Sequence, residues 1–253
     1  MTVTFLGTGT SQGVPVIGCD CKVCNSPDPA DNRLRSSIHI EVNNKSIVID
    51  TGPDFRQQML REKIRFLDAV LFTHPHKDHI AGMDDIRSFN FLLKKAIPVY
   101  ANGITKEQLI NEFSYVFDPN GYGGGPRIHM HEIFKEPFYF EDLKIIPVEV
   151  YHDKLPVLGY RIMDFCYITD ANFISDQALE KVYGSRILVL NALQKRPHPS
   201  HFTLDEALEQ IDRIKPEKAY LTHISHNLGL HAVVSKDLPD NVFLAYDGLK
   251  LNL

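Results

Sequence analysis

Hydrophobic and polar positions along the chain predict strands and helices interleaved in both halves. Apolar, β-branched runs predict strands, and polar segments with an apolar residue every three or four positions predict helices. Strands are expected at Val3 to Leu6, Ser36 to Val42, Lys45 to Ile49, Ala69 to Thr73, Ile97 to Tyr100, Leu143 to Glu149, Leu158 to Met163, Phe165 to Thr169, Ile187 to Asn191 and Ala219 to Thr222. Helices are expected at Asp54 to Lys63, Gly82 to Leu93, Thr105 to Phe113 and Leu204 to Ile214. This order fits a layered α/β fold without selecting one.

Turn and cap residues refine several boundaries. Asn43-Asn44 between two strand patterns predicts a hairpin. Thr105 is expected to cap the helix that it begins, since a threonine hydroxyl can accept from the first backbone N–H groups of a helix. The glycine-rich stretch Asn120 to Pro126 predicts a flexible loop. Part of a substrate rim is one interpretation of Tyr122 to Pro126, and simple flexibility is the alternative.

Composition narrows the class of protein. The chain has 253 residues, 43% of them hydrophobic and 23% charged, which is enough for one core, and no linker divides it, so a single domain over residues 1–253 is expected. The net charge of −5 without a long basic run argues against general binding to nucleic acid. No apolar run reaches the roughly 18 residues of a membrane span, and the first residues lack a secretory pattern. Three of the four cysteines are crowded at Cys19, Cys21 and Cys24, which suits a reducing cytosol rather than a disulfide framework, so a cytoplasmic protein is expected.

The strongest chemical signal is a cluster of metal-ligand residues after a buried strand. The sequence His74-Pro75-His76-Lys77-Asp78-His79 brings three imidazoles and one carboxylate into one short loop, in a chain with 12 histidines and no tryptophan. Imidazole with carboxylate suits divalent zinc, manganese or iron. Ordinary turn chemistry does not call for three histidines here, so a metal site is favoured over a solvent-exposed polar loop.

The pattern His-x-His-x-Asp-His after a strand resembles the signature of the metallo-β-lactamase superfamily. That resemblance implies a four-layer αββα sandwich and extends over nearly the whole chain, through VEVYHDKLPVLGYRI, CYITDANF and AYLTHIS. It implies one metal held by three histidines, a second held by Asp78 and two histidines, and one bridging aspartate together with a bridging hydroxide. The implied ligands are His74, His76 and His152 on one metal, Asp78, His79 and His223 on the other, and Asp170 between them.

Catalytic residues follow from the same resemblance. Two metals close together would activate a shared water for attack on a phosphoryl group, with Asp78 counted both as a ligand and as a catalytic residue. His201, before a predicted helix, resembles the general-acid histidine of phosphodiesterases in the superfamily, and its ordinary pKa suits that role. His198 is a rival for it. Asp50, at the end of a strand, resembles the carboxylate that orients ligand histidines, and a strand-ending turn residue is the alternative.

A second metal site is predicted in the segment Cys19-Asp20-Cys21-Lys22-Val23-Cys24. Three thiols in one loop are one ligand short of the tetrahedral set of a structural zinc, and their close spacing argues against a disulfide framework. His226, three residues beyond His223, is the candidate fourth ligand. Cys166 lies in a strand pattern and is expected in the core.

With LTHISH, the cysteine segment resembles the PhnP branch of the superfamily, cyclic-phosphate phosphodiesterases with a Cys3His structural zinc. This resemblance implies a binuclear enzyme with zinc or manganese that hydrolyses small, cyclic phosphate diesters, and a homodimer. The alternatives are a tRNA 3′-processing endonuclease, and a non-catalytic metal-binding scaffold. Arg35 and Arg56 are expected to be surface or ion-paired residues, and no role is assigned to His39, His129, His131 or His231.

Overall fold

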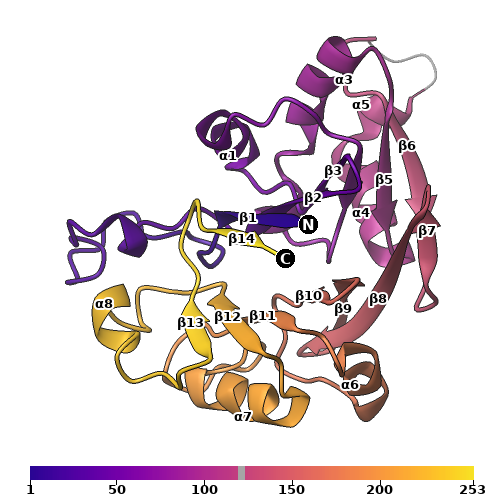
Figure 1. The fold of residues 1–253 in the computed structure, drawn as a ribbon. Coiled ribbons are helices and arrows are strands. Elements are labelled where there is room, and N and C mark those ends of the chain that lie inside the picture. The colour runs from indigo at the N-terminus through magenta and orange to yellow at the C-terminus, as the bar shows by residue number, and fades with distance from the viewer. Residues whose placement is uncertain (119–122) are drawn as a thin grey trace. The chain divides into compact units, whose positions relative to one another are not determined.

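The computed structural model describes residues 1–118 and 123–253, and the chain divides into two compact units. The first unit consists of Met1–Gly7, Arg35–Ile133 and Gly248–Leu253. The second consists of Thr8–Leu34 and Phe134–Asp247. Each unit contains its own mixed sheet, and each is described separately (Figure 1).

The sheet of the first unit has the strand order β14-β1-β2-β3-β4-β5-β6. Antiparallel pairing joins β14, β1, β2 and β3, and parallel pairing continues from β3 to β6. The strands are β1 (Thr2–Gly7), β2 (Ser37–Val42), β3 (Lys45–Ile49), β4 (Ala69–Leu71), β5 (Ile97–Ala101), β6 (Ile128–Glu132) and β14 (Lys250–Asn252). The helices are α1 (Phe55–Glu62), α2 (Lys77–Ile80), the 3-10 turn η2 (Met83–Ile86), α3 (Arg87–Leu93), α4 (Gly103–Glu112) and α5 (Ser114–Phe117).

The predicted hairpin is confirmed: β2 and β3 are joined by Asn43 and Asn44, both with positive φ, which asparagine tolerates better than most residues. The predicted helix Gly82 to Leu93 is divided into η2 and α3. Its apolar side is as expected, because Ile86 and Phe89 are buried in the core of this unit.

The predicted cap at Thr105 is wrong. Helix α4 begins at Gly103, and the side chain of Asn102 accepts a hydrogen bond from the backbone N–H of Thr105 at 2.9 Å. Asparagine is among the best capping residues, so the earlier polar residue takes the position and the threonine lies within the first turn.

The sheet of the second unit has the order β13-β12-β11-β10-β9-β8-β7. The strands β7 to β10 pair antiparallel, and β10 to β13 pair parallel. The strands are β7 (Phe138–Phe140), β8 (Leu143–His152), β9 (Leu155–Ile162), β10 (Phe165–Tyr167), β11 (Ile187–Asn191), β12 (Lys218–Thr222) and β13 (Val242–Leu244). The helices are η1 (Pro29–Asp31), α6 (Asp176–Val182), α7 (Leu204–Ile214) and α8 (His231–Val234).

Helix α7 has the bounds that its sequence predicts. Thr203 and Glu206 form a capping box, in which each side chain bonds to the other residue's backbone N–H. Ala207, Ile211 and Ile214 are buried in the core of this unit together with strand residues. The cap fixes the point where the preceding loop enters the helix.

Three further expectations concern the glycine-rich loop, membrane spans and the number of domains. Of the predicted loop Asn120 to Pro126, residues 120–122 lie outside the described residues, and 123–125 form a turn and a bend. Within the described residues, no helix combines the length and the apolar character that crossing a bilayer requires. That residues 1–253 form a single domain stays a prediction.

Candidate metal centres

The first cluster follows β4 in the first unit. His74 is buried, His76 precedes α2, and Asp78 and His79 lie on that short helix. The imidazole of His74 lies 4.6 Å from that of His76 and 4.2 Å from that of His79, measured between ring centroids. The carboxylate Oδ2 of Asp78 lies 3.1 Å from Nε2 of His79. The predicted motif therefore gathers its side chains around one point of this unit.

Gly52 explains how the motif loop packs so closely. A Cβ atom at Gly52 would lie 2.1 Å from the carbonyl oxygen of Asp78, so only glycine allows this approach. Next to it, the N–H of Thr51 donates to the carbonyl of His79 at 2.8 Å. The loop after β3 thus holds the backbone of α2, the short helix that carries Asp78 and His79.

Asp50 fixes the orientation of two histidines in this cluster. Its carboxylate accepts hydrogen bonds from the Thr73 N–H at 2.8 Å, from the Thr73 hydroxyl at 2.8 Å and from Nδ1 of His79 at 2.7 Å. Because the Thr73 hydroxyl donates to Asp50, its oxygen can only accept from Nδ1 of His74, 2.9 Å away. Both imidazoles therefore carry their proton on Nδ1 and present the Nε2 lone pair to a metal. Burial raises the pKa of Asp50, and His79 opposes that rise.

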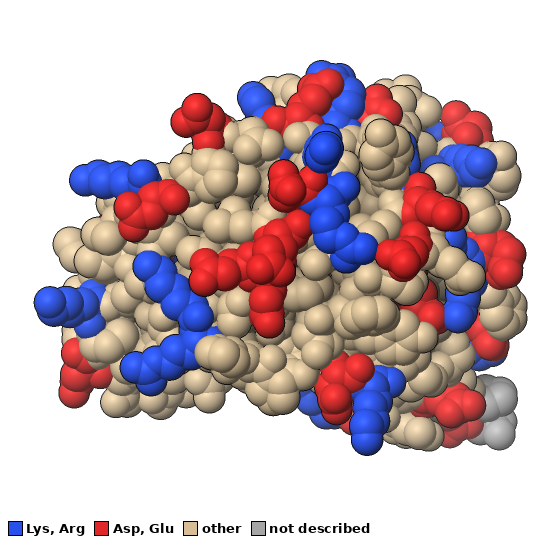
Figure 2. All heavy atoms as spheres, turned by 90° about the horizontal axis from the view of Figure 1, so that it is seen from below, with Lys and Arg blue, Asp and Glu red and all other residues tan. Residues whose placement is uncertain are grey.

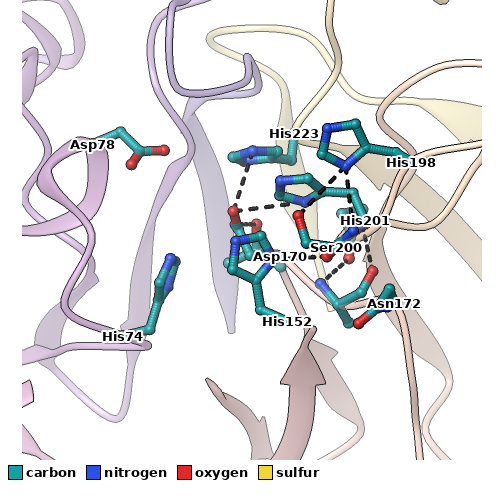
Figure 3. Close-up of polar contacts among 12 residues, drawn as sticks. His74, Asp78, His152, Asp170, Asn172, His198, Ser200, His201 and His223 are labelled. Carbon is teal, nitrogen blue, oxygen red and sulfur yellow. Dashed lines mark hydrogen bonds and ion pairs between the residues drawn. The ribbon is translucent and has the colours of Figure 1, made fainter. Parts of the chain in front are cut away.

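The second cluster gathers residues from four segments of the second unit (Figure 3). His152 ends β8, Asp170 follows β10, His201 precedes α7 and His223 follows β12. Ligand atoms of His152, Asp170 and His201 all lie within 4.8 Å of one another. Nε2 of His223 lies 3.2 Å from the Asp170 carboxylate. The predicted bridging aspartate thus stands among three histidines.

Tautomer and backbone conformation are also set in this cluster. Nδ1 of His152 donates to the carbonyl of Ser200 at 2.7 Å, which leaves the Nε2 lone pair for a metal. Asp170 and His223 have φ of 57° and 55°, as Asp50 has 65°. Non-glycine residues pay for this left-handed conformation, and such strain concentrates at functional sites.

His201 is buried with its ring against those of His152 and His223, at centroid distances of 4.4 Å and 4.8 Å. Burial, and next the neighbouring His223, lower the pKa of His201 to about 3. The imidazole is therefore neutral near pH 7 in this structure. Its rival His198 lies farther out, half-buried, with a ring centroid 5.0 Å from that of His201.

The predicted zinc loop lies within the second unit, where ligand atoms of Cys19, Cys21, Cys24 and His226 all fall within 4.8 Å of one another. Nδ1 of His226 lies 3.2, 3.5 and 3.4 Å from the three sulfur atoms, in chain order. One ring nitrogen carries at most one proton and cannot donate to three thiols. A tetrahedral zinc with ordinary bond lengths separates sulfur and nitrogen by about 3.6 Å, so the four side chains fit that ion.

The surroundings of this loop favour the thiolate of Cys21 and disfavour that of Cys24. The N–H of Cys24 donates to the sulfur of Cys21 at 3.4 Å and lowers the pKa of Cys21 to about 6. Burial raises the pKa of Cys24 to about 11, although the N–H of Val16 opposes this. Because the pKa of Cys21 is lowered and that of Cys24 is raised, Cys21 loses its proton first. A bound cation would displace the remaining thiol protons.

The bystander residues lie as expected. Cys166 is fully buried in the core. Arg35 forms an ion pair with Asp54 at 3.1 Å, and Arg56 is exposed. Sequence reasoning missed Thr73 and Ser200, which orient ligand histidines. A hydroxyl or carbonyl that accepts a hydrogen bond from a histidine ring follows no recognisable spacing in the sequence. The position of Thr73 directly before the motif is the one signal of such a partner here.

Comparisons with known proteins define the class. A family model described as "Beta-lactamase superfamily domain" matches residues 45–224. A crystal structure described as "a New Diphosphatase from the PhnP Family" is 43% identical with a TM-score of 0.93, covering 100% of this chain and 97% of that one. The chain belongs to the β-lactamase superfamily and, within it, to the PhnP family. The predicted α/β metallo-β-lactamase fold is confirmed, and the chain stands among metal-dependent hydrolases.

Curated relatives are longer than this chain. An octanoyltransferase of Porphyromonas gingivalis is 39% identical over 253 residues, which is 99% of this chain and 51% of that protein. A ribonuclease Z of Exiguobacterium sp. is 25% identical over 164 residues, 64% of this chain and 48% of that protein. The chain spans about half the length of these relatives.

Proposed function

We propose that the chain is a metal-dependent phosphodiesterase that hydrolyses small phosphate diesters, cyclic ones foremost. The observation that carries this proposal is the tautomer of three histidines: His74, His79 and His152 each donate from Nδ1 and so present Nε2 as a ligand. The relatives named as a diphosphatase and a ribonuclease act on bonds to phosphorus, which supports the same chemistry.

The two clusters are proposed to act together on two divalent cations, zinc or manganese. One cation would be held by His74, His76 and His152, the other by Asp78, His79 and His223, with Asp170 shared. When bound, the cations supply Lewis-acid activation of water and neutralise charge on phosphoryl oxygens. Asp50, Thr73 and the Ser200 carbonyl keep the ligand rings oriented for both. Asp78 contributes to catalysis in its role as a ligand.

His201 is proposed to protonate the departing oxygen. It can do so only if it is protonated, while burial keeps its pKa low in this structure. A phosphate anion beside the imidazole favours the charged form and raises that pKa. The donor would therefore become charged when the substrate is bound. His198, less buried and farther from Asp170, is the weaker candidate.

A substrate panel tests the reaction. Purified protein loaded with zinc or with manganese is assayed on a cyclic phosphodiester of a five-membered ring, a linear aryl diester, a diphosphate, a precursor tRNA and an octanoyl thioester. We expect the cyclic diester to have the highest kcat/KM. Cleavage of precursor tRNA alone would establish the nuclease alternative, and activity on the thioester alone would remove the phosphodiesterase proposal. No turnover with metals bound would favour a non-catalytic scaffold.

The role of His201 is tested in the same assay. His201→Ala should lower kcat on the cyclic diester by about 100-fold or more while both cations remain bound, because general acids contribute about 10²- to 10⁴-fold. His198→Ala is the matched comparison and should retain most of the activity. Equal losses in the two variants would remove the assignment.

The proposal extends to ion content and assembly. We propose two active-site cations, one structural zinc at the cysteine loop, a homodimer and a cytoplasmic location. Elemental analysis should give three metals per chain, and light scattering should give twice the mass of the chain. Figure 2 shows acidic and basic side chains intermixed over the face that it presents.

A further inference from the structure

The loop before α7 carries His201, and the ring of this histidine is held indirectly. Within the described part of the chain, Nδ1 of His201 has no hydrogen-bond partner, and the carboxylate Oδ1 of Asp170 is 3.8 Å away. Apart from its packing against the rings of His152 and His223, the imidazole is directed by where the backbone of residues 197–202 is fixed. The ties of this loop to the rest of the second unit are what position the ring.

Asn172 makes a side-chain tie to that loop (Figure 3). Its Nδ2 donates to the carbonyl of Pro199 at 2.9 Å, and its Oδ1 accepts from the N–H of Asp153 at 2.8 Å. Its own N–H donates to the carbonyl of Tyr151 at 2.8 Å. Asn172 thus joins the end of β8, where the ligand His152 lies, to the loop that carries His201.

Two further contacts lie beside this tie. The carbonyl of Ser200 accepts from Nδ1 of His152 at 2.7 Å, and the N–H of Phe202 donates to the carbonyl of Ala171 at 2.8 Å. The backbone is therefore held on both sides of His201, at Ser200 and at Phe202. The contact through Asn172 is the one that a side-chain substitution can remove without replacing a proposed metal ligand such as His152.

The residue type matters because the position needs a donor and an acceptor at once. An asparagine amide offers both. An aspartate keeps an oxygen that accepts from the N–H of Asp153, but its second oxygen would face the carbonyl oxygen of Pro199 with no hydrogen to donate. An alanine offers neither. The three residue types therefore separate the two halves of the contact.

We propose that Asn172 is a positioning residue for proton donation: it fixes the Pro199–Ser200 backbone against β8 and thereby aims the imidazole of His201. This inference rests on the proposed function. Asn172 touches neither substrate nor metal in this proposal, and it acts through the loop.

Leaving-group dependence tests it, since a general acid matters for a poor leaving group and little for a good one. With an alkoxide leaving group, Asn172→Ala and Asn172→Asp should lower kcat by about 10- to 100-fold, and with 4-nitrophenolate by about 2-fold or less. The double variant Asn172→Ala, His201→Ala should be no slower than His201→Ala alone. Equal losses on both substrates, or additive losses in the double variant, would overturn the proposal.

Hydrogen exchange of the metal-free protein supplies a readout independent of activity. Peptides covering residues 197–203 should exchange at least about 10-fold faster in Asn172→Asp than in the wild type. Asn241→Ala is the matched control, because Asn241 also donates to a carbonyl, that of Pro216, and should leave this loop unchanged. Unchanged exchange in both Asn172 variants would refute the tie. If the wild type hydrolyses no phosphodiester, the proposed function fails, while the exchange experiment still decides whether Asn172 holds the loop.

Discussion

Asp50 is not a predicted metal ligand itself, but its hydrogen bonds orient two histidines that are. It accepts three hydrogen bonds and, directly or through Thr73, fixes the protons of His74 and His79. Asp50→Asn should weaken binding of the active-site cations by about 10- to 100-fold, since an amide cannot receive all three donors. Metal titration of the metal-free protein measures this. Asp212→Asn, at an exposed position, is the control, and an unchanged affinity in Asp50→Asn would contradict the prediction.

His39 gives a residue-scale prediction for pH. Nε2 of His39 donates to the Ser46 hydroxyl, which itself donates to the carbonyl of Phe66, and burial lowers the pKa of His39 to about 4. The unfolded chain binds this proton near pH 6.5, the native state only near pH 4. Stability should therefore fall as pH falls between these values, by about 3 kcal/mol in total from this group.

Urea unfolding at pH 7, 6 and 5 checks this dependence. In His39→Gln, the decline in unfolding free energy between pH 7 and pH 5 should be smaller than in the wild type, because the buried titrating group is gone. His129→Gln, at an exposed position, should keep the wild-type slope. Identical slopes in wild type and His39→Gln would show that His39 is not the group responsible.

The candidate site could be predicted from the sequence where its residue types are diagnostic. Few structures other than metal sites require three cysteines in one loop, or three histidines with an aspartate in another. The structure gathers each set within its own unit. Residues such as Thr73 and Asn172 could not be found in this way. Their role comes from which backbone or ring atom lies within 3 Å, and that is set by folding rather than by spacing.

At the scale of elements, the zinc loop is a segment with little regular structure. Of the residues that are predicted to hold zinc, Cys21 has its pKa lowered to about 6 by the N–H of Cys24, so we expect it to be the thiol that binds metal most readily. Cys21→Ser should remove about one zinc per chain and lower the free energy of unfolding by roughly 2–5 kcal/mol, because the bound ion contributes to folding. The folded fraction should keep its turnover.

Zinc analysis and thermal unfolding measure these effects. Cys166→Ala is the matched control, since this buried cysteine should alter stability without changing the zinc content. Full zinc content at the wild-type melting temperature in Cys21→Ser would exclude the structural site.

Elements were predictable where pattern and cap agreed. Helix α7 has its predicted bounds because an amphipathic run follows a capping box. The sequence analysis missed the strands β6, β7, β13 and β14 and the helices α5, α6 and α8, since each has too few residues to show a clear periodicity. Helix α4 begins earlier than predicted because Asn102 competes successfully for the cap.

At the scale of the whole molecule, the charge balance separates a small-substrate enzyme from a nuclease. The net charge is −5, so few phosphates of a polymer could be neutralised. The kcat/KM for a cyclic diester should change by about 3-fold or less between 50 and 200 mM salt. A steep fall of activity with salt, as counterion release from a nucleic acid produces, would contradict a small substrate.

The pairing of β14 with β1 has a consequence for synthesis. These strands lie at opposite ends of the chain, and the register joins Thr2 to Asn252. During synthesis β1 is made before β14, and the residues of the second unit are translated between the two. The edge of β1 that pairs with β14 therefore stays open during that interval. Such distant pairing is slow to form, and an open strand edge invites association with other chains. Nascent protein is therefore most in need of a chaperone in the interval before β14 leaves the exit tunnel.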